Sequence, residues 1–287
     1  MRFARRRRAY GEYPNLSRTD VISDGSLMLC RNPAKKAFGD NDAFLISSDW
    51  DDPDELPEAF AQVEAEERSL ATKHAFAWNP DFGYLSPNPS HCGTGLVVQA
   101  TMHLEGLHII GDLPPVLSAL TALRFRYSGY TAEGVTNAAY IFRIWNGSTI
   151  GLSEQDLLAR IQRVFSDLAD QETAARKVLV EEHPLLLADA IERALATLRH
   201  ARLLSPTEYA DMLSPIRLAT IMGFIEGITR ERIDKSLRRH LERPVSDPPS
   251  SPEEERIRDN RDARFAEKVN AEFANVRLTD RAKELLS

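Results

Sequence analysis

The chain has 287 residues, 43% of them hydrophobic, which is enough apolar material to bury a large core and excludes a chain that is disordered throughout. Its net charge of -7 argues against general nucleic-acid binding. No apolar run approaches the roughly 20 residues that cross a bilayer, and no apolar secretory stretch follows Met1, so we expect a cytoplasmic protein with neither nucleic acid nor a membrane as partner.

The chain opens with a basic segment in which Arg2 is followed by four consecutive arginines, Arg5 to Arg8. Terminal segments of this kind are usually solvated and frayed. We therefore predict a basic tail over residues 1–19, with an arm that docks on an anionic partner as the alternative.

Residues 20–152 have the pattern of a sheet region. The pair Asp24-Gly25 separates two short apolar runs and favours a tight hairpin. Further strands are predicted at 43–47, 96–104, 124–130 and 140–145, and one surface helix at 59–71. Between residues 81 and 95 the density of Pro, Gly, Asn and Ser predicts a loop that leads into a strand, which is a common place for chemistry.

From residue 153 the pattern is helical. Ser153, Ser205 and Ser251 each stand three residues before an acidic residue, which is the spacing of a helix N-cap. We predict a helical part over 153–243, a linker rich in Pro, Ser and Asp over 244–252, and a semi-detached terminal helix within 253–287. Strands followed by helices indicate the α+β class.

The chain contains only two cysteines, Cys30 and Cys92, and they do not form a C-x-x-C pair. A disulfide framework and a structural zinc site are therefore not expected. His103 and His108 are five residues apart near the end of a predicted strand, so they would not share one face, and we predict no metal site.

Five segments between residues 78 and 151 match one known family in the same order. They are Trp78-Asn79 with Gly83-Tyr84, Pro89-Ser90, Gly93-Thr-Gly95-Leu96, Gly129-Tyr-Thr-Ala-Glu-Gly134, and Ile141-Phe-Arg-Ile-Trp-Asn146 with Thr149-Ile-Gly151. They resemble the W-N-x-x-x-G-Y, C-P-S/T-N, G-T-G-L-R, R-G-x-x-G-E-G and F-x-I-S-N…L-G segments of the guanidino kinases, the ATP:guanido phosphotransferases.

The helical part extends this resemblance. Residues 204–208, 213–218 and 223–228 are similar to the helical part of bacterial protein-arginine kinases rather than to creatine kinases, so the likeness covers about residues 20–270. The resemblance implies an antiparallel sheet flanked by helices, followed by a helical C-terminal part. Residues 39–45 match the family's N-E-E-D-H-L-R strand poorly, and we expect an N-terminally shortened, degenerate member.

Phosphoryl transfer depends on positive charge arranged around the triphosphate and its magnesium. In the family, arginines supply much of that charge, but two of their positions fall on Val97 and Ser128 here, and the family's reactive cysteine falls on Asn88. Glu133 keeps the place of an acidic residue in the loop that approaches the guanidinium. It is the one candidate catalytic residue, and a solvated loop carboxylate is the alternative.

A second candidate site lies near the C-terminus. The run that begins at Arg256 is similar to the R-D-x-R-x-A run of bacterial protein-arginine kinases, in which an Arg-Asp pair binds phosphoarginine. The match implies that Arg258 and Asp259, with Arg261 one turn along, bind that group. A guanidinium fork suits a phosphoryl group, and a carboxylate suits guanidino nitrogens. The alternative is a charged helix face in water.

These observations lead to three functional hypotheses. The first is a pseudokinase that needs no cofactor and binds phosphoarginine-bearing proteins, a full-length arginine kinase or its adaptor. The second is an active but divergent enzyme that uses Mg-ATP to phosphorylate protein arginine, with cations recruited from elsewhere, such as Arg124, Arg126 or Arg143. The third is a structural subunit, since the family tends to self-associate and a homo- or hetero-oligomer is expected.

Overall fold

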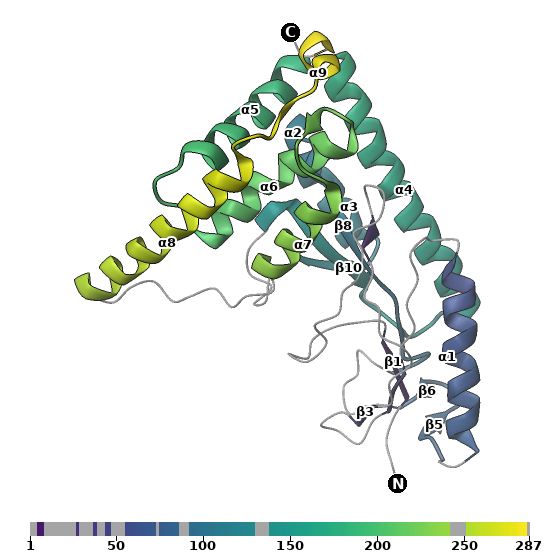
Figure 1. Cartoon of the computed structure of the whole chain (residues 1–287). Coiled ribbons are helices and arrows are strands. Elements are labelled where there is room, and N and C mark those ends of the chain that lie inside the picture. Colours follow the sequence, from purple (N-terminus) through teal and green to yellow (C-terminus); the bar gives the residue numbers. More distant parts are fainter. Residues whose placement is uncertain are drawn as a thin grey trace. The chain divides into compact units, whose positions relative to one another are not determined.

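The computed structural model describes residues 5–8, 27–28, 37–38, 44–46, 55–72, 75–85, 92–129, 138–241 and 251–285. Two site residues predicted from the sequence, Asn88 and Glu133, lie outside this described part, as does the predicted turn at Asp24-Gly25. The described residues form a mixture of helices and strands, which confirms the α+β class (Figure 1).

The chain divides into two compact units. The first unit contains residues 1–102, 115–127 and 143–170, and the second contains residues 103–114, 128–142 and 171–287. The predicted division at residue 153 is therefore not the boundary between these units, because each unit combines segments that are distant in sequence.

The strands are short. They are β1 Arg5–Arg8, β2 Leu27–Met28, β3 Ala37–Phe38, β4 Phe44–Ile46, β5 Trp78–Asn79, β6 Gly83–Tyr84, β7 Leu96–Val97, β8 Gln99–His103, β9 Phe125–Gly129, β10 Ile141–Asn146, β11 Ile225–Glu226 and β12 Arg277–Leu278. Two four-stranded sheets have the orders β3-β4-β1-β7 and β2-β8-β10-β9. The pairs β2–β8, β3–β4, β5–β6 and β11–β12 are antiparallel.

The predicted strand at 96–104 is present but divided at Val98. The backbone N–H of Val98 donates to the side-chain oxygen of Asn146 at 2.8 Å instead of to a neighbouring strand. A side chain that takes a backbone donor ends regular strand pairing at that residue. This explains why β7 and β8 are separate strands.

Strand β1 differs from the prediction for residues 1–19, because Arg5–Arg8 form a strand rather than part of a basic tail. It pairs in parallel with β4 on one side and with β7 on the other. Four consecutive arginines carry no apolar alternation, so their sequence does not indicate a strand. Strand formation here depends on pairing with distant segments, which the local sequence does not encode.

The helices are α1 Leu56–Ala71, α2 Glu105–Ile110, α3 Leu113–Ala122, α4 Glu154–Glu181, α5 Pro184–His200, α6 Pro206–Ile221, α7 Arg230–Leu241, α8 Pro252–Phe273 and α9 Asp280–Leu285. The three predicted N-caps are confirmed. Ser153, Ser205 and Ser251 each accept the backbone N–H three residues later, at 3.1, 3.1 and 3.2 Å. Helices α2, α3 and α9 were not predicted.

The terminal helix α8 packs within the second unit, which differs from the semi-detached helix expected from the sequence. Figure 1 shows α8 side by side with α5. Ala266, Val269 and Phe273 on its second half are buried, whereas its first half is largely exposed. The helix was predicted to be semi-detached because a linker precedes it. Its apolar residues recur every three to four positions, however, and therefore form one face that is buried.

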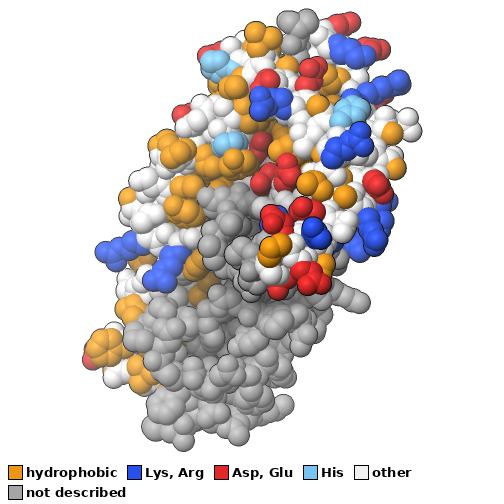
Figure 2. All heavy atoms as spheres, turned by 90° about the vertical axis from the view of Figure 1, so that its left-hand side faces the viewer, with side chains coloured by type: hydrophobic (Ala, Val, Ile, Leu, Met, Phe, Trp, Pro, Cys, Tyr) orange, Lys and Arg blue, Asp and Glu red, His pale blue; other side chains and the backbone are white. Residues whose placement is uncertain are grey.

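No helix in the described part of the chain combines the length and the apolar character needed to cross a bilayer. On the described part of the face in Figure 2, acidic and basic side chains are interspersed rather than gathered by sign.

Candidate functional site

The turn that contains Gly93, Thr94 and Gly95 is fixed by hydrogen bonds within the first unit. The backbone N–H of Tyr84 donates to the Gly93 carbonyl at 2.8 Å, and the N–H of Thr94 donates to the Thr149 carbonyl at 2.8 Å. Gly93 has φ +90°, and a Cβ atom there would lie 2.1 Å from the Thr149 carbonyl oxygen. Only glycine satisfies both conditions.

Asn146 connects this turn to strand β10. Its side chain is buried, accepts the N–H of Val98 at 2.8 Å and donates to the carbonyls of Leu96 and Ser148 at 3.0 and 3.1 Å. The matched segments around residues 93 and 146 are thus brought together, although about fifty residues separate them in sequence. This arrangement positions Val97 at the end of β7.

Val97 and Ser128, the two described positions at which the sequence predicted that family arginines are replaced, are both half-buried. Val97 lies in β7 of the first unit, and Ser128 lies in β9 of the second. A valine and a serine side chain cannot carry a positive charge. At a partly buried position, the electrostatic attraction between an arginine and a phosphate would be stronger than it is in water. The predicted match therefore places one uncharged side chain in each unit at a position expected to carry an arginine.

The second unit contains a buried polar cluster that the sequence did not reveal. We call it the α6 cluster; it consists of His103, Glu105, Ser214, Arg217 and Asp234, all less than a tenth exposed. Arg217 donates to Asp234 at 2.7 Å and to Nδ1 of His103 at 3.0 Å. The Ser214 hydroxyl has three close neighbours: Oε2 of Glu105 at 2.5 Å, Nε2 of His103 at 2.7 Å and the carbonyl of Ala139 at 2.8 Å.

Hydrogen-bonding capacity decides the protonation of this cluster. Because Arg217 only donates, Nδ1 of His103 accepts, and Nε2 therefore carries the proton that it donates to Ser214. The carbonyl of Ala139 only accepts, so it takes the single hydroxyl proton of Ser214. Glu105 must then donate to Ser214, which requires a protonated carboxyl group.

The electrostatic surroundings agree with this assignment. The pKa of Glu105 is raised to about 8, mainly by burial and also by the neighbouring carboxylates of Glu172 and Asp211, while the hydrogen bond with Ser214 acts in the opposite direction. Burial, together with the charges of Arg217 and Arg176, holds the pKa of His103 well below its ordinary value. Both side chains are therefore neutral near pH 7.

A second buried group fixes the start of α2. The carboxylate of Glu172 accepts the N–H groups of Gly106 and Leu107 at 2.9 and 3.0 Å and pairs with Arg176 at 2.9 Å. It thereby satisfies helix donors that the N-cap residue Leu104 leaves without a side-chain partner. The α6 cluster and this pair are both structural, because each of their groups is fully or almost fully buried.

The predicted phosphoarginine-binding residues lie on the exposed half of α8. Arg258 and Asp259 have side chains 42% and 48% exposed, and their closest charged atoms are 3.5 Å apart. Arg258 also faces Glu255 at 3.7 Å, whereas Arg261 pairs with Asp262 at 3.1 Å. The structure therefore brings Arg258 and Asp259 together on an accessible surface and directs Arg261 toward a different carboxylate.

Within the described part of the chain, no three His, Cys, Asp or Glu side chains converge closely enough to hold a metal ion. His108 instead stacks on the ring of Tyr140, with ring centres 3.5 Å apart.

Comparison with known proteins relates both units to one group of enzymes. Residues 49–175 match the ATP:guanido phosphotransferase C-terminal catalytic domain, and residues 184–283 match the protein-arginine kinase McsB C-terminal domain. The protein-arginine kinase of Moorella thermoacetica is 34% identical over 180 residues, which is 63% of this chain and 51% of that protein. The protein-arginine kinase of Bacillus cereus is 29% identical over 176 residues, or 61% and 50%. The chain thus spans about half the length of the curated relatives it matches.

Proposed function

We propose that the chain is a pseudokinase of the ATP:guanido phosphotransferase family, because residues 49–175 match the catalytic domain of that family and residues 184–283 match the C-terminal domain of protein-arginine kinases. It retains the scaffold and binds a protein partner, either a phosphoarginine-bearing protein or a true arginine kinase, without transferring phosphate. The observation that carries this proposal is the pair of uncharged side chains, Val97 and Ser128, at two positions where the family has arginine.

The expected loss of activity follows from the chemistry of phosphoryl transfer. The transition state spreads negative charge over the transferred group, and a single finger-type arginine contributes roughly 10³ to 10⁵ to the rate. Two such positions without charge leave little stabilisation of that transition state. Affinity for Mg-ATP should fall for the same reason.

A thermal-shift experiment with millimolar Mg-ATP tests this proposal. A ligand at 100 times its dissociation constant stabilises the folded state by about 2.7 kcal/mol, so binding would raise the melting temperature. We expect no rise for the wild-type chain, with magnesium alone and Mg-ADP as comparisons. A concentration-dependent rise with Mg-ATP would contradict the pseudokinase assignment.

Partner binding is proposed to involve Arg258 and Asp259 on α8. Their charged ends are adjacent and accessible, so a phosphoryl group could meet the guanidinium while the guanidino nitrogens of the same ligand meet the carboxylate. Arg261 is already paired with Asp262, and its contribution would require that pair to open.

Titration of free phosphoarginine against the wild type and Asp259→Ala tests the α8 site. We expect saturable binding that Asp259→Ala and Arg258→Ala each weaken by about tenfold or more, since charge-assisted hydrogen bonds are lost. Arg264→Ala, an exposed residue on the same helix, is the matched control. Equal binding by all four proteins would exclude this site, and binding to an arginine kinase that survives Arg258→Ala would place the partner elsewhere.

One observation favours a second candidate, an active but divergent phosphotransferase. Arg8 of β1 is the register partner of Val97 in β7, so the backbone brings consecutive arginines beside the strand in which the family's cation is replaced. Such an enzyme could use these arginines, or Arg126 and Arg143, in place of the missing ones.

Transfer of radiolabelled phosphate from ATP to an arginine-rich protein tests this candidate. If it is correct, transfer should be lost in both Glu133→Gln and Arg8→Gln and kept in Glu181→Gln, which changes an exposed glutamate at the end of α4. Absence of transfer to every protein substrate offered would reject it.

A further inference from the structure

A pocket of about 280 Å³ lies in the first unit, at the ends of β9 and β10 where the chain enters α4. Its lining residues are Leu123, Arg124, Phe125, Asn146, Ser148, Ile150, Gly151, Leu152, Leu157 and Arg160. Two of these side chains are cationic and none is acidic. Neither Val97 nor Ser128 lines this pocket, whereas Arg124 is one of the cations that an active phosphotransferase could recruit.

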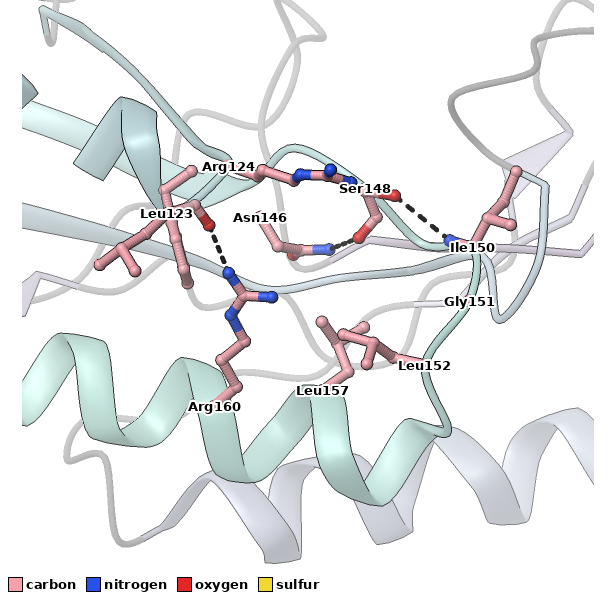
Figure 3. A pocket seen from close by; sticks show the side chains of 10 residues that line it. Leu123, Arg124, Asn146, Ser148, Ile150, Gly151, Leu152, Leu157 and Arg160 are labelled. Carbon is pink, nitrogen blue, oxygen red and sulfur yellow. Dashed lines mark hydrogen bonds between the residues drawn. The ribbon is translucent and has the colours of Figure 1, made fainter. Parts of the chain in front are cut away.

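Arg160 is held in place by one hydrogen bond. Its Nη2 donates to the Leu123 carbonyl at 2.6 Å, and Figure 3 shows the side chain rising from α4 into the space below Arg124 and Ser148. A guanidinium has five N–H donors in a planar fork, and this bond uses one of them. Among the described residues no second partner of this guanidinium is found, so its other donors can meet an anion in the pocket.

Arg124 is fixed through its backbone. It has φ +62°, a left-handed conformation that is uncommon for a residue with a side chain. Its N–H donates to the Thr121 carbonyl at 2.9 Å, and its own carbonyl accepts the N–H of Gly147 at 2.8 Å. A Cβ atom on Gly147 would lie 2.6 Å from that carbonyl, so the glycine permits the close approach. Backbone strain of this kind is often retained where it directs a functional side chain.

The remainder of the pocket is apolar. Three large apolar side chains in its lining are partly exposed to solvent: Leu123, Ile150 and Leu152 are 45%, 45% and 41% exposed. Phe125 and Leu157 are buried in its lining. Apolar walls with a few convergent polar groups are typical of small-molecule sites. Asp156, in the first turn of α4, accepts from the Ser153 hydroxyl at 2.5 Å and is not part of the pocket lining.

We propose that this pocket binds a small organic anion, with a carboxylate or phosphate head between Arg124 and Arg160 and an apolar body against the leucine side chains. Two guanidinium groups can hold such a head through charge-assisted hydrogen bonds. The apolar rim explains why the ligand should carry an aliphatic or aromatic group rather than be a bare inorganic ion. This inference does not depend on the pseudokinase proposal.

Four probes separate the contributions to binding: phenyl phosphate, benzoate, inorganic phosphate and neutral benzyl alcohol, each titrated calorimetrically at low ionic strength. We expect phenyl phosphate or benzoate to bind saturably, and inorganic phosphate and benzyl alcohol to bind at least about tenfold more weakly, because each lacks one half of the recognition. The proposal would be overturned if neither phenyl phosphate nor benzoate bound saturably, or if benzyl alcohol bound as tightly as they do.

Two variants connect the binding to the named residues. Arg160→Gln should weaken binding of the organic anion by about tenfold or more. Arg163 is an exposed arginine on the same helix outside the pocket, so Arg163→Gln should leave this binding unchanged. Arg124→Gly removes a cation and relieves the positive φ, so it should weaken binding while the melting temperature is kept or raised. Unchanged binding in both Arg160→Gln and Arg124→Gly would refute the site.

Discussion

Ser214 has one hydroxyl proton and three hydrogen-bonding neighbours, and this mismatch makes the α6 cluster sensitive to pH. While Glu105 is protonated, every neighbour of Ser214 is satisfied. Once Glu105 ionises, it competes with the Ala139 carbonyl for the hydroxyl proton, and one buried acceptor is left without a donor. An unsatisfied buried polar group costs about 1–3 kcal/mol.

The free energy of unfolding should therefore contain a contribution from Glu105 that decreases as pH rises. The folded-state pKa of Glu105, about 8, is above the ordinary value of 4.5, so the folded chain binds its proton more tightly. The contribution is complete below about pH 4.5 and is lost between there and pH 8, with a slope of up to about 1.4 kcal/mol per pH unit.

Glu105→Gln tests this contribution, because an amide can donate to Ser214 as the protonated carboxyl does and cannot ionise. Urea unfolding of both proteins at pH 5, 6, 7 and 8 should show a stability difference that shifts in favour of the variant as pH rises. His103 titrates with the opposite sign, since its lowered pKa destabilises the fold at acid pH in both proteins, and it cancels from the difference. A constant difference across the four pH values would show that Glu105 is ionised throughout.

At the scale of single elements, the turn between β6 and β7 depends on the absence of a side chain at Gly93. Gly93 and Gly111 have nearly equal φ angles of +90° and +88°, but a Cβ atom meets the Thr149 carbonyl in the first case and nothing within 4 Å in the second. Substitutions at these two glycines therefore distinguish the cost of the left-handed backbone conformation from the cost of steric overlap.

We expect Gly111→Ala to cost about 1 kcal/mol, the usual penalty of a left-handed conformation, and Gly93→Ala to cost clearly more, because backbone must also move. Thermal unfolding of the two variants measures the difference. Equal destabilisation would mean that the contact between Gly93 and Thr149 relaxes without cost.

At the scale of the whole molecule, α8 connects the proposed phosphoarginine site to the core of the second unit. Arg199 donates to the carbonyls of Phe273 and Val276, and Asn270 donates to the Ala201 carbonyl at 3.1 Å. The helix is thus held to the end of α5 at its C-terminal half, while Arg258 and Asp259 project from its exposed half. A ligand bound there would act on a helix that is anchored in the core.

Phe273→Ala should destabilise the second unit by about 3–5 kcal/mol, because this ring is fully buried and its removal leaves a cavity. Ile257→Ala on the exposed half of α8 is the matched control and should stay within about 0.5 kcal/mol, since that side chain is 63% exposed. Denaturant unfolding followed by circular dichroism measures both. A small effect of Phe273→Ala would support the semi-detached helix predicted from the sequence.

The sequence by itself indicated the resemblance to guanidino kinases, the fold class and the local signals. The ordered glycine, asparagine and proline motifs identified the catalytic domain, and Ser153, Ser205 and Ser251 marked helix starts, because caps and tight turns are decided by neighbouring residues. The replacement of cations at Val97 and Ser128 was also predicted from the sequence and stays a prediction.

Only the tertiary structure decided the rest, because these features depend on residues that are distant in the chain. The α6 cluster joins His103 to Ser214 and Arg217, and the pocket joins Arg124 to Arg160, without any local signature. Arg5–Arg8 became a strand through pairing with β4 and β7, although nothing in the run itself favours one. Burial and long-range pairing are properties of the folded chain, and they override local propensity where the two differ.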